Sequence, residues 1–248
     1  MCGRYVIKST PDQIRALFGY PEQPNFPPRY NIAPTQPVPI VRRTEGERHF
    51  ALVRWGLIPS WVKDPRTLSL LINARGESVV DKPAFRAAMK RRRCLFPADG
   101  FYEWRVDGGR KRPYFVQRKG GGLLAFAGLW ETWTGPNGEE QQTAAIVTTD
   151  ANRTLAAIHD RMPVIIEPAG FDFWLDSDKV DAKTAAAMIA PAPESLLEAY
   201  EISPAVNRVA NDSAALIEPL TARPATAEQP HPTPRPKRRK ETTQGSLF

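Results

Sequence analysis

The chain has 248 residues, of which 42% are hydrophobic and 25% are charged. This composition is typical of a globular protein of one or two domains, and it excludes a disordered or fibrous protein over most of the length. The formal net charge is +7, and more than half of it comes from the stretch Arg223 to Phe248. The remaining body is only mildly basic, so it needs a local cluster of cations to hold an anionic polymer.

The two cysteines, Cys2 and Cys94, exclude a disulfide-rich scaffold and fit a reducing compartment. No apolar run approaches the roughly 18–20 residues of a membrane span, and the first residues lack the apolar stretch of a signal peptide. We therefore expect a soluble intracellular protein without a membrane partner. It would lie in the cytoplasm with the nucleoid of a bacterium, or in the nucleus if the source is eukaryotic.

The first predicted element is a short helix after Thr10, because Thr10-Pro11-Asp12 is typical of an N-cap and first turn. The Pro- and Asn-rich stretch 21–39 predicts an ordered loop. Alternating or continuous apolar patterns then predict seven strands. They cover residues 38–41, 50–57, 94–96, 101–106, 114–117, 123–130 and 143–149.

Helical spacing predicts further helices at 82–93, which has one basic face, and at 151–158, 171–175 and 181–189. A last strand is predicted at 200–202. Strands joined by hairpin-length loops and interrupted by helices predict an α+β fold: a single domain around a mostly antiparallel, barrel-like sheet with short helices. We assign this domain to residues 1–222 and a disordered, Pro-rich basic tail to residues 223–248.

Cys2 is the most informative residue for chemistry. A small residue after the initiator favours removal of Met1, which would leave cysteine as the amino terminus. Its α-amine has a pKa near ~7.7–8.0, so a fraction is neutral at pH 7 and can condense with an aldehyde to an imine. The thiol can then add to the same carbon and close a five-membered thiazolidine. The alternative is an incidental cysteine at a disordered terminus.

Three other polar residues lie in notable surroundings. Glu103 stands in the run Gly100-Phe101-Tyr102-Glu103-Trp104, where burial would raise its pKa and suit it to proton transfer. His159 stands at a predicted helix-to-strand junction, and Asn73 opens the run Asn73-Ala74-Arg75-Gly76-Glu77. Each has a plain structural alternative: an outward-facing strand carboxylate, a structural histidine and a turn.

The sequence predicts neither a metal site nor a cofactor. The two cysteines and the scattered histidines have no zinc-type spacing, and no phosphate-binding or dinucleotide fingerprint is present. Trp61 and Trp104 are candidate flat surfaces for nucleobases, with core packing as the alternative for such aromatic residues.

Taken together, ordered segments resemble the SOS-response-associated peptidase (SRAP) family over about residues 2–210. The segments that carry the resemblance are Met1-Cys2-Gly3-Arg4, Tyr30-Asn31-Ile32-Ala33-Pro34-Thr35, Arg54-Trp55-Gly56-Leu57-Ile58-Pro59-Ser60-Trp61, Asn73-Ala74-Arg75-Gly76-Glu77, Arg92-Arg93-Cys94-Leu95, Gly100-Phe101-Tyr102-Glu103-Trp104, Ala127-Gly128-Leu129-Trp130 and His159-Asp160-Arg161-Met162-Pro163.

The resemblance implies a single α+β domain whose mature amino terminus is Cys2. It also implies binding to abasic sites in single-stranded DNA and a covalent thiazolidine link that shields the lesion. The family's site falls on Cys2, Asn73, Glu103 and His159, all present here. We expect Glu103 to assist opening of the sugar ring, Asn73 to hold the amine or a sugar hydroxyl, and His159 to pass a proton.

The softer expectations concern DNA contacts and rival functions. Arg4, Arg75 and Arg161 are candidate phosphate contacts, with Trp61 and Trp104 as stacking surfaces. One rival function is a cysteine peptidase or amidohydrolase with Cys2 as nucleophile and His159 as base. A second rival is a non-catalytic DNA reader. We expect a monomer in every case.

The extreme C-terminus ends Gln244-Gly245-Ser246-Leu247-Phe248 after a basic, proline-rich stretch. It is similar to the short peptides by which bacterial replication and repair proteins dock on the sliding clamp. Leu247 and Phe248 would fill an apolar pocket while Gln244 forms hydrogen bonds at its rim. The alternatives are an incidental apolar end and, for Lys237 to Lys240, a DNA tether or nuclear-import signal.

Overall fold

Five strands close into a barrel in the computed structural model, which describes residues 2–220. The barrel order is β10–β4–β3–β6–β9 and back to β10, and only the β10–β4 pair is parallel. Its strands are β3 (Pro37–Thr44), β4 (Glu47–Trp55), β6 (Arg93–Ala98), β9 (Leu124–Thr134) and β10 (Glu140–Asp150). Two short strands, β5 (Asn73–Arg75) and β11 (Arg161–Pro163), pair with β10 from outside this ring.

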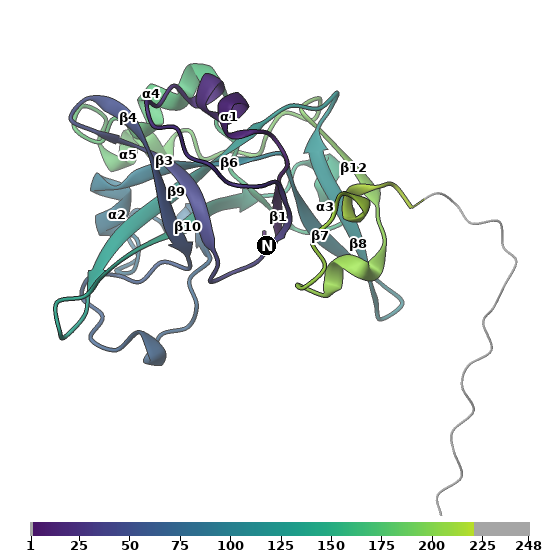
Figure 1. Ribbon diagram of the computed structural model, residues 1–248, viewed down its shortest axis with the longest axis horizontal. Helices are drawn as coiled ribbons and strands as arrows, with labels where there is room; N and C mark the ends of the chain where they lie inside the picture. Colours follow the sequence, from purple (N-terminus) through teal and green to yellow (C-terminus); the bar gives the residue numbers. More distant parts are fainter. Residues whose placement is uncertain (1, 221–248) are drawn as a thin grey trace, which may run out of the picture.

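A second, antiparallel sheet stands beside the barrel (Figure 1). Its order is β12 (Leu197–Glu201), β8 (Arg110–Arg118), β7 (Gly100–Asp107), β1 (Tyr5–Ile7) and β2 (Arg29–Ile32). The chain passes from β6 to β7 through Asp99 alone, so the two sheets are joined directly. Aromatic residues pack between them: Tyr5 meets Trp55 edge-to-face at 5.3 Å between ring centroids, and Phe101 meets Phe126 at 5.7 Å.

The helix predicted after Thr10 is confirmed as α1 (Pro11–Phe18). Thr10 and Gln13 form a reciprocal capping box, and Gly19 ends the helix with a φ of +71°, which a residue without Cβ adopts freely. Phe18 is buried and stacks on Phe171 at 5.1 Å. This contact packs α1 against Phe171, the first residue of the helix Phe171–Leu175.

The other predicted helices are present, although three of them are shorter than expected. They are α2 (Arg86–Arg91), α3 (Arg153–Ala156), α4 (Phe171–Leu175) and α5 (Ala182–Ala186). The helix α2 stops early because Arg93 already belongs to β6, and α3 starts late because Asn152 is its N-cap. Five 3-10 turns complete the elements: η1 (Pro65–Thr67), η2 (Gly76–Ser78), η3 (Pro168–Gly170), η4 (Pro204–Asn207) and η5 (Ala214–Ile217). None of the helices within residues 2–220 is long and apolar enough to cross a membrane.

The α+β class with a barrel-like sheet is confirmed. All seven predicted strands exist and are longer than predicted, although β4 ends at Trp55 and β9 starts at Leu124. The last strand, predicted at 200–202, is present as β12. The prediction for residues 21–39 was wrong in part, because this stretch contains β2 and the start of β3. The strands β1, β5 and β11 were missed, since three residues are too few for a periodic pattern. The predicted tail at 223–248 lies outside the described residues.

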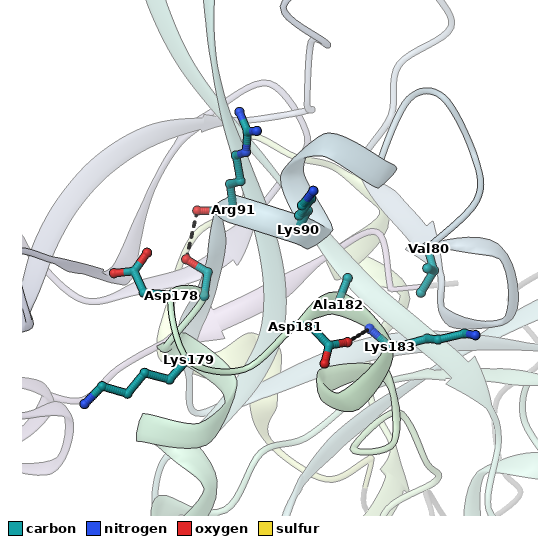
Figure 2. Close-up of a pocket in the computed structure, with 9 residues that line it drawn as sticks. Val80, Lys90, Arg91, Asp178, Lys179, Asp181, Ala182 and Lys183 are labelled. Carbon is teal, nitrogen blue, oxygen red and sulfur yellow. Dashed lines mark hydrogen bonds between the residues drawn. The ribbon is translucent and has the colours of Figure 1, made fainter.

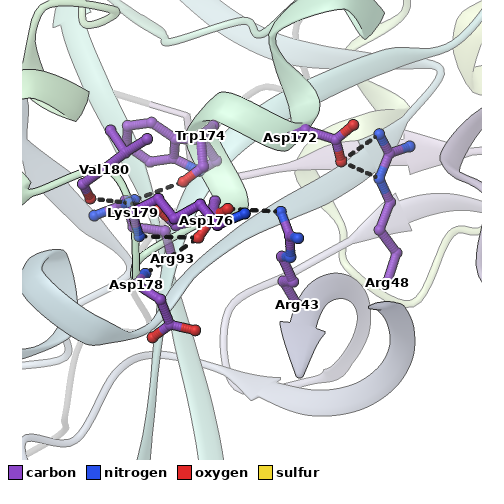
Figure 3. A network of polar contacts seen from close by, with 9 residues as sticks. All are labelled: Arg43, Arg48, Arg93, Asp172, Trp174, Asp176, Asp178, Lys179 and Val180. Carbon is purple, nitrogen blue, oxygen red and sulfur yellow. Dashed lines mark hydrogen bonds and ion pairs between the residues drawn. The ribbon is translucent and has the colours of Figure 1, made fainter. Parts of the chain in front are cut away.

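A buried arginine fixes the segment after α4 to the barrel (Figure 3). Arg93, only 1% exposed, donates hydrogen bonds to the backbone carbonyls of Trp174, Asp176 and Val180. Its charge is solvated by these carbonyl dipoles, which a buried guanidinium requires. Arg43 on β3 also forms an ion pair with the Asp176 carboxylate at 2.9 Å. The segment 174–180 therefore has a fixed position.

Candidate functional site

The four predicted site residues come from four separate parts of the chain. Cys2 precedes β1, Asn73 opens β5, Glu103 lies in β7, and His159 lies between α3 and β11. The pairing of β1 with β7 continues toward the amino terminus, because the Tyr102 backbone N–H donates to Arg4 O at 3.0 Å. This pairing carries the first residues of the chain along the strand that holds Glu103.

Asn73 contacts Cys2 directly. Its side-chain Nδ2 donates to the backbone oxygen of Cys2 at 2.9 Å. The parallel register of β5 with β10, in which Asn73 lies opposite Ile146, fixes the backbone that carries this amide. The Asn73 Oδ1 atom is buried and has no hydrogen-bond partner among the described residues. A buried acceptor left unpaired costs about 1–3 kcal/mol, so a substrate N–H or O–H would be held well there.

Glu103 is a buried carboxyl group, 3% exposed, on a strand packed on both faces. Burial, which disfavours its charged form, raises its pKa to about 7. The close packing depends on Gly100 at the start of β7, where a Cβ would come within 2.5 Å of the Val116 backbone oxygen. Near neutral pH Glu103 therefore exists in both protonation states, as proton transfer in both directions requires.

His159 lies across from this carboxyl group, with its Nε2 at 4.0 Å from Glu103 Oε2. The Nδ1 edge of the His159 ring is held by the two residues that follow it. The Arg161 backbone N–H donates to His159 Nδ1 at 3.0 Å, and Asp160 Oδ1 lies 2.8 Å from the same atom. Burial lowers the pKa of His159. The ring is thus oriented with Nε2 toward Glu103 and is mostly neutral at pH 7.

The Cys2 thiol is completely buried and lies 3.9 Å from its acceptor, the backbone oxygen of Arg4. Burial raises its pKa far above the usual range, and the negative charge of Glu103 raises it further. The thiol is therefore protonated at neutral pH. This environment disfavours a thiolate in the free protein. It suits a thiol that reacts in a later step, when a base is present to take its proton.

The candidate phosphate contacts each stand two residues from a site residue, as the sequence shows for Arg4, Arg75 and Arg161. Arg75 is exposed on β5. Arg4 is half-buried and donates through Nη1 to Asn31 Oδ1 at 2.7 Å and to Val206 O at 3.1 Å. Its remaining guanidinium N–H groups make no hydrogen bond to another described residue. Arg75 is thus the most accessible of the three cations.

Arg161 is engaged by the protein itself. It forms ion pairs with Glu77 of η2 and with Asp150 of β10, and its Nη2 donates to Thr148 O at 2.9 Å. These contacts join the segment after Asn73, the end of β10 and the strand after His159. With a side chain 11% exposed, Arg161 holds the two halves of the site together, whatever else it contacts.

The two candidate stacking residues differ in their surroundings. Trp61 is 61% exposed, although its loop is anchored by a hydrogen bond from Trp133 Nε1 to Val62 O at 2.6 Å. Trp104 follows Glu103 directly, is half-buried, and donates from Nε1 to Asn207 Oδ1 at 2.8 Å. The side chain of Trp61 is large, aromatic and exposed to solvent although its loop is anchored. Packing does not explain such a position, which suits contact with a ligand.

Sequence reasoning gave no role to Asn31, although this residue lies in a segment that carries the resemblance. Its side chain is 3% exposed, accepts from Arg4, and donates through Nδ2 to the backbone oxygens of Val206, Arg208 and Asn211. It thereby ties the segment after β12 to the amino-terminal residues. The only signal was a polar residue beside the apolar Ile32 and Ala33, which a sequence pattern cannot distinguish from a surface position.

The described residues also bear on metal binding. Within residues 2–220, no group of three or more His, Cys, Asp or Glu side chains could hold a metal ion. Both cysteines have free thiols. The chemistry that this arrangement offers is therefore that of an amino-terminal cysteine backbone held by an amide, beside a carboxyl group with a pKa near 7 and an oriented imidazole.

The comparisons with known proteins agree with this fold. The sequence matches the family described as SOS response associated peptidase (SRAP) over residues 1–209. The chain therefore belongs to the SRAP family. A crystal structure of a protein from Bacteroides thetaiotaomicron has the same fold, with a TM-score of 0.80 and 25% sequence identity, and the match covers 89% of this chain and 100% of that one.

Curated relatives are more similar in sequence. The abasic site processing protein YoqW of Bacillus subtilis (strain 168) is 38% identical over 222 residues, which cover 88% of this chain and 99% of that protein. The abasic site processing protein YedK of Escherichia coli (strain K12) is 31% identical and covered completely, with 89% of this chain. HMCES of Xenopus tropicalis, also an abasic site processing protein, is 30% identical, with 86% of this chain and 76% of that protein covered.

Proposed function

We propose that this protein processes abasic sites in single-stranded DNA by linking to them covalently through Cys2, which becomes the amino terminus once Met1 is removed. The observation that carries the proposal is the convergence of Cys2, Asn73, Glu103 and His159 from four segments. Relatives that are named abasic site processing proteins support the substrate class. The link would shield the lesion from strand cleavage.

The reaction begins with the sugar, which is mostly a closed hemiacetal. Glu103 takes the proton of the C1′ hydroxyl as the ring opens and returns a proton to the ring oxygen, which gives the aldehyde. A pKa of about 7 allows both transfers near neutral pH. The α-amine of Cys2 then attacks C1′, and loss of water from the carbinolamine leaves an imine.

In the second stage the Cys2 sulfur bonds to the imine carbon while the thiol proton passes to the nitrogen, and the thiazolidine closes with no further reactant. Asn73 holds the Cys2 backbone through Nδ2 and offers its unpaired Oδ1 to the amine or to a sugar hydroxyl. His159 passes a proton to the ring-opened sugar and assists formation or reversal of the imine.

The rival assignment as a cysteine peptidase or amidohydrolase needs a Cys2 thiolate. The raised pKa of the buried Cys2 thiol opposes that requirement. A pure reader of DNA would have no use for the same four residues. We therefore favour a lesion-crosslinking enzyme over both.

The test is a denaturing gel of the protein with a single-stranded oligonucleotide that contains one abasic site. We expect a covalent band for the wild-type protein and none for Cys2→Ala. An undamaged oligonucleotide of the same sequence is the control. Absence of the band with wild-type protein whose Met1 has been removed would overturn the proposal.

DNA contacts form a second part of the proposal. Arg4, Arg75 and Arg161 would contact phosphates, and Trp61 and Trp104 would stack on or wedge between bases. Such contacts predict salt-sensitive binding with little sequence preference. The exposure of Arg75 and Trp61 supports their part in this surface most strongly.

The tail supplies a further part of the proposal, although Gln244, Leu247 and Phe248 lie outside the described residues. We propose that this end docks on the replication sliding clamp while the basic stretch before it tethers DNA, so that a monomer acts at stalled forks on the nucleoid. A fluorescence-polarisation titration of the tail peptide with purified clamp tests it. Binding unchanged by Leu247→Ala with Phe248→Ala would refute the clamp motif.

A further inference from the structure

A basic pocket lies away from the four site residues, between the end of α2 and the segment 177–183. It has a volume of about 730 Å³ and is lined by the cations Lys90, Arg91, Lys179 and Lys183. Figure 2 shows the residues that line this pocket: the side chains of Arg91, Lys179 and Lys183 point in different directions, and Val80 lies at the edge. All four cations are exposed. We refer to these four residues as the basic pocket.

Two acidic residues, Asp178 and Asp181, also line the pocket and reduce its formal charge from +4 to +2. The Asp181 carboxylate caps α5, where it accepts from the backbone N–H groups of Lys183 and Thr184 and from Thr184 Oγ1. Asp178 is exposed. Among the ion pairs of residues 2–220, none involves a cation of the basic pocket. Its positive charge is therefore available to a ligand.

The two walls of the pocket are held in a fixed relation. On one side, the hydrogen bonds of buried Arg93 to Trp174, Asp176 and Val180 anchor the backbone that carries Lys179 (Figure 3). On the other side, Ser177 Oγ donates to the backbone oxygen of Arg91 at 3.2 Å, which ties this segment to the end of α2. Cations on fixed backbones lose less freedom when they bind a ligand.

The pocket is connected to the proposed lesion site by a short piece of chain. Val80 comes seven residues after Asn73, so the two lie at most about 25 Å apart. Gly76, between them, packs so closely on Ile189 that a Cβ would meet its Cγ2 atom at 2.2 Å. The segment after β5 therefore packs directly against the segment after α5.

Exposed cations occur along the stretch of chain that leads from Asn73 to the pocket. They are Arg75, Lys82, Arg86 and Lys90, the last three at a spacing of four residues. At one phosphate per 3.4 Å of duplex strand, a separation of at most about 25 Å corresponds to at most about seven phosphates. A nucleic-acid strand can therefore reach from the lesion site to the basic pocket.

We infer that the basic pocket binds backbone phosphates of the DNA flanking the lesion, several nucleotides from the crosslinked sugar. The inference rests on the proposed function, because that function supplies the polyanion. Contacts to phosphates carry no base readout, so the pocket would lengthen the footprint without adding sequence preference. The pocket would then increase affinity for long strands and leave the chemistry unchanged.

The test compares the full chain with the double variant Lys90→Glu with Arg91→Glu. The matched control is Arg110→Glu with Lys111→Glu, which makes the same change of charge at the exposed start of β8, next to its turn with β7. Affinity is measured with oligonucleotides that carry a non-reactive abasic analogue, flanked on each side by about 3 or about 15 nucleotides, at several salt concentrations.

We expect the pocket variant to lose about tenfold in affinity for the long oligonucleotide and to show a smaller salt dependence, with binding of the short one within about twofold of wild type. Equal losses in the pocket variant and the control variant would overturn the inference, because general charge would then explain them. So would an unchanged ratio of long to short affinity in the pocket variant. An acidic peptide that binds the pocket while this ratio stays unchanged would identify a protein partner instead.

This design distinguishes failure of the proposed function from failure of the inference about the basic pocket. Crosslinking of the short abasic oligonucleotide by the wild-type protein tests the proposed function alone. If that crosslink forms at the same rate in the pocket variant, any loss on long strands belongs to the basic pocket. If the wild-type protein forms no crosslink, the proposed function fails whatever the long-strand affinities are.

Discussion

The two cysteines of this protein show what distinguishes a site from a core. Cys2 and Cys94 are both fully buried, and burial raises the pKa of both thiols. Cys94 lies inside the barrel, close to Phe96 and Gly128, where it fills space. Cys2 lies beside Asn73 and within the electrostatic reach of Glu103. A thiol that is only buried, such as that of Cys94, is unreactive. Neighbouring groups that position the residue and transfer protons, as around Cys2, allow it to react.

The largest expected effect separates the two cysteines. Cys2→Ala should abolish the stable covalent adduct with an abasic oligonucleotide, because the thiol that closes the ring is removed and the remaining α-amine forms only a reversible imine. Cys94→Ala should leave adduct yield unchanged and lower the free energy of unfolding by about 1–2 kcal/mol through a small cavity. The adduct is measured on a denaturing gel and the stability by urea unfolding. If a fully folded Cys94→Ala variant formed no adduct, the distinction between a site cysteine and a core cysteine would be wrong.

Glu103 should account for the next largest effect. Glu103→Gln should slow adduct formation about 100-fold, since general acid–base catalysis contributes at least that much. Below pH 6 the wild-type rate should fall with a slope approaching two, because Glu103 and the α-amine both become protonated. The Gln variant should retain a slope of one. A stopped time course over pH 5–8 gives both slopes, and identical slopes would remove Glu103 from the proton transfer.

The same carboxyl group should lower stability at high pH. Its folded-state pKa of about 7 lies above its unfolded value of 4.5, so the folded state holds the proton longer and loses stability as pH rises through 7. The difference between the two pKa values corresponds to a loss of about 3 kcal/mol in the free energy of unfolding. Relaxation of the protein around the charged carboxylate should reduce this loss to about 1–2 kcal/mol. Glu103→Gln should therefore be more stable than wild type at pH 8 and nearly equal at pH 4. Thermal unfolding at both pH values measures this, and a constant difference would contradict it.

His159 should have a smaller effect, distinct from that of Glu103. His159→Ala should slow formation about tenfold and change the rate of release from the DNA more than Glu103→Gln does, because the imidazole faces the carboxyl group from the outer edge of the site. Release is followed by trapping freed protein with an excess of a second, labelled abasic oligonucleotide. Wild-type rates in both directions would refute the role of His159.

The smallest expected effect concerns phosphate contact by Arg75. Arg75→Ala should weaken binding about threefold on any sequence and reduce the slope of log affinity against log salt by about 0.7. Lys119→Ala, at the exposed turn between β8 and β9, is the control. A loss confined to one sequence would indicate base readout instead.

Much of the fold was accessible from the sequence because its strands are long. Strands β9 and β10 have apolar runs that are typical of buried strands. The N-cap sequence at Thr10 predicts the start of α1. The strand β1 could not be predicted, because its three residues acquire their meaning only when β2 and β7 pair with it. Closure of the barrel by the parallel β10–β4 pair depends equally on tertiary contacts.

The four site residues were singled out from their surroundings in the sequence, each with a structural alternative, and the resemblance favoured the functional interpretation. The environment of Glu103 followed from its aromatic neighbours, and its burial agrees with that expectation. The contact between Asn73 and Cys2 joins residues 71 positions apart, and no local signal predicts it. The engagement of Arg161 by Glu77 and Asp150 was also missed, because a sequence does not show which cations are already paired.

The central claim is that both functional groups of an amino-terminal Cys2 bond to one carbon of the lesion. It is tested most directly by comparing wild-type protein with Cys2→Ser on a single-stranded abasic oligonucleotide, with and without borohydride, followed by mass spectrometry of the linked peptide. We predict a heat-stable wild-type adduct on residue 2 without reductant. The Ser variant should give a stable adduct only after borohydride traps its imine. An equally heat-stable adduct of Cys2→Ser without reductant, or a wild-type link at a lysine, would contradict the account.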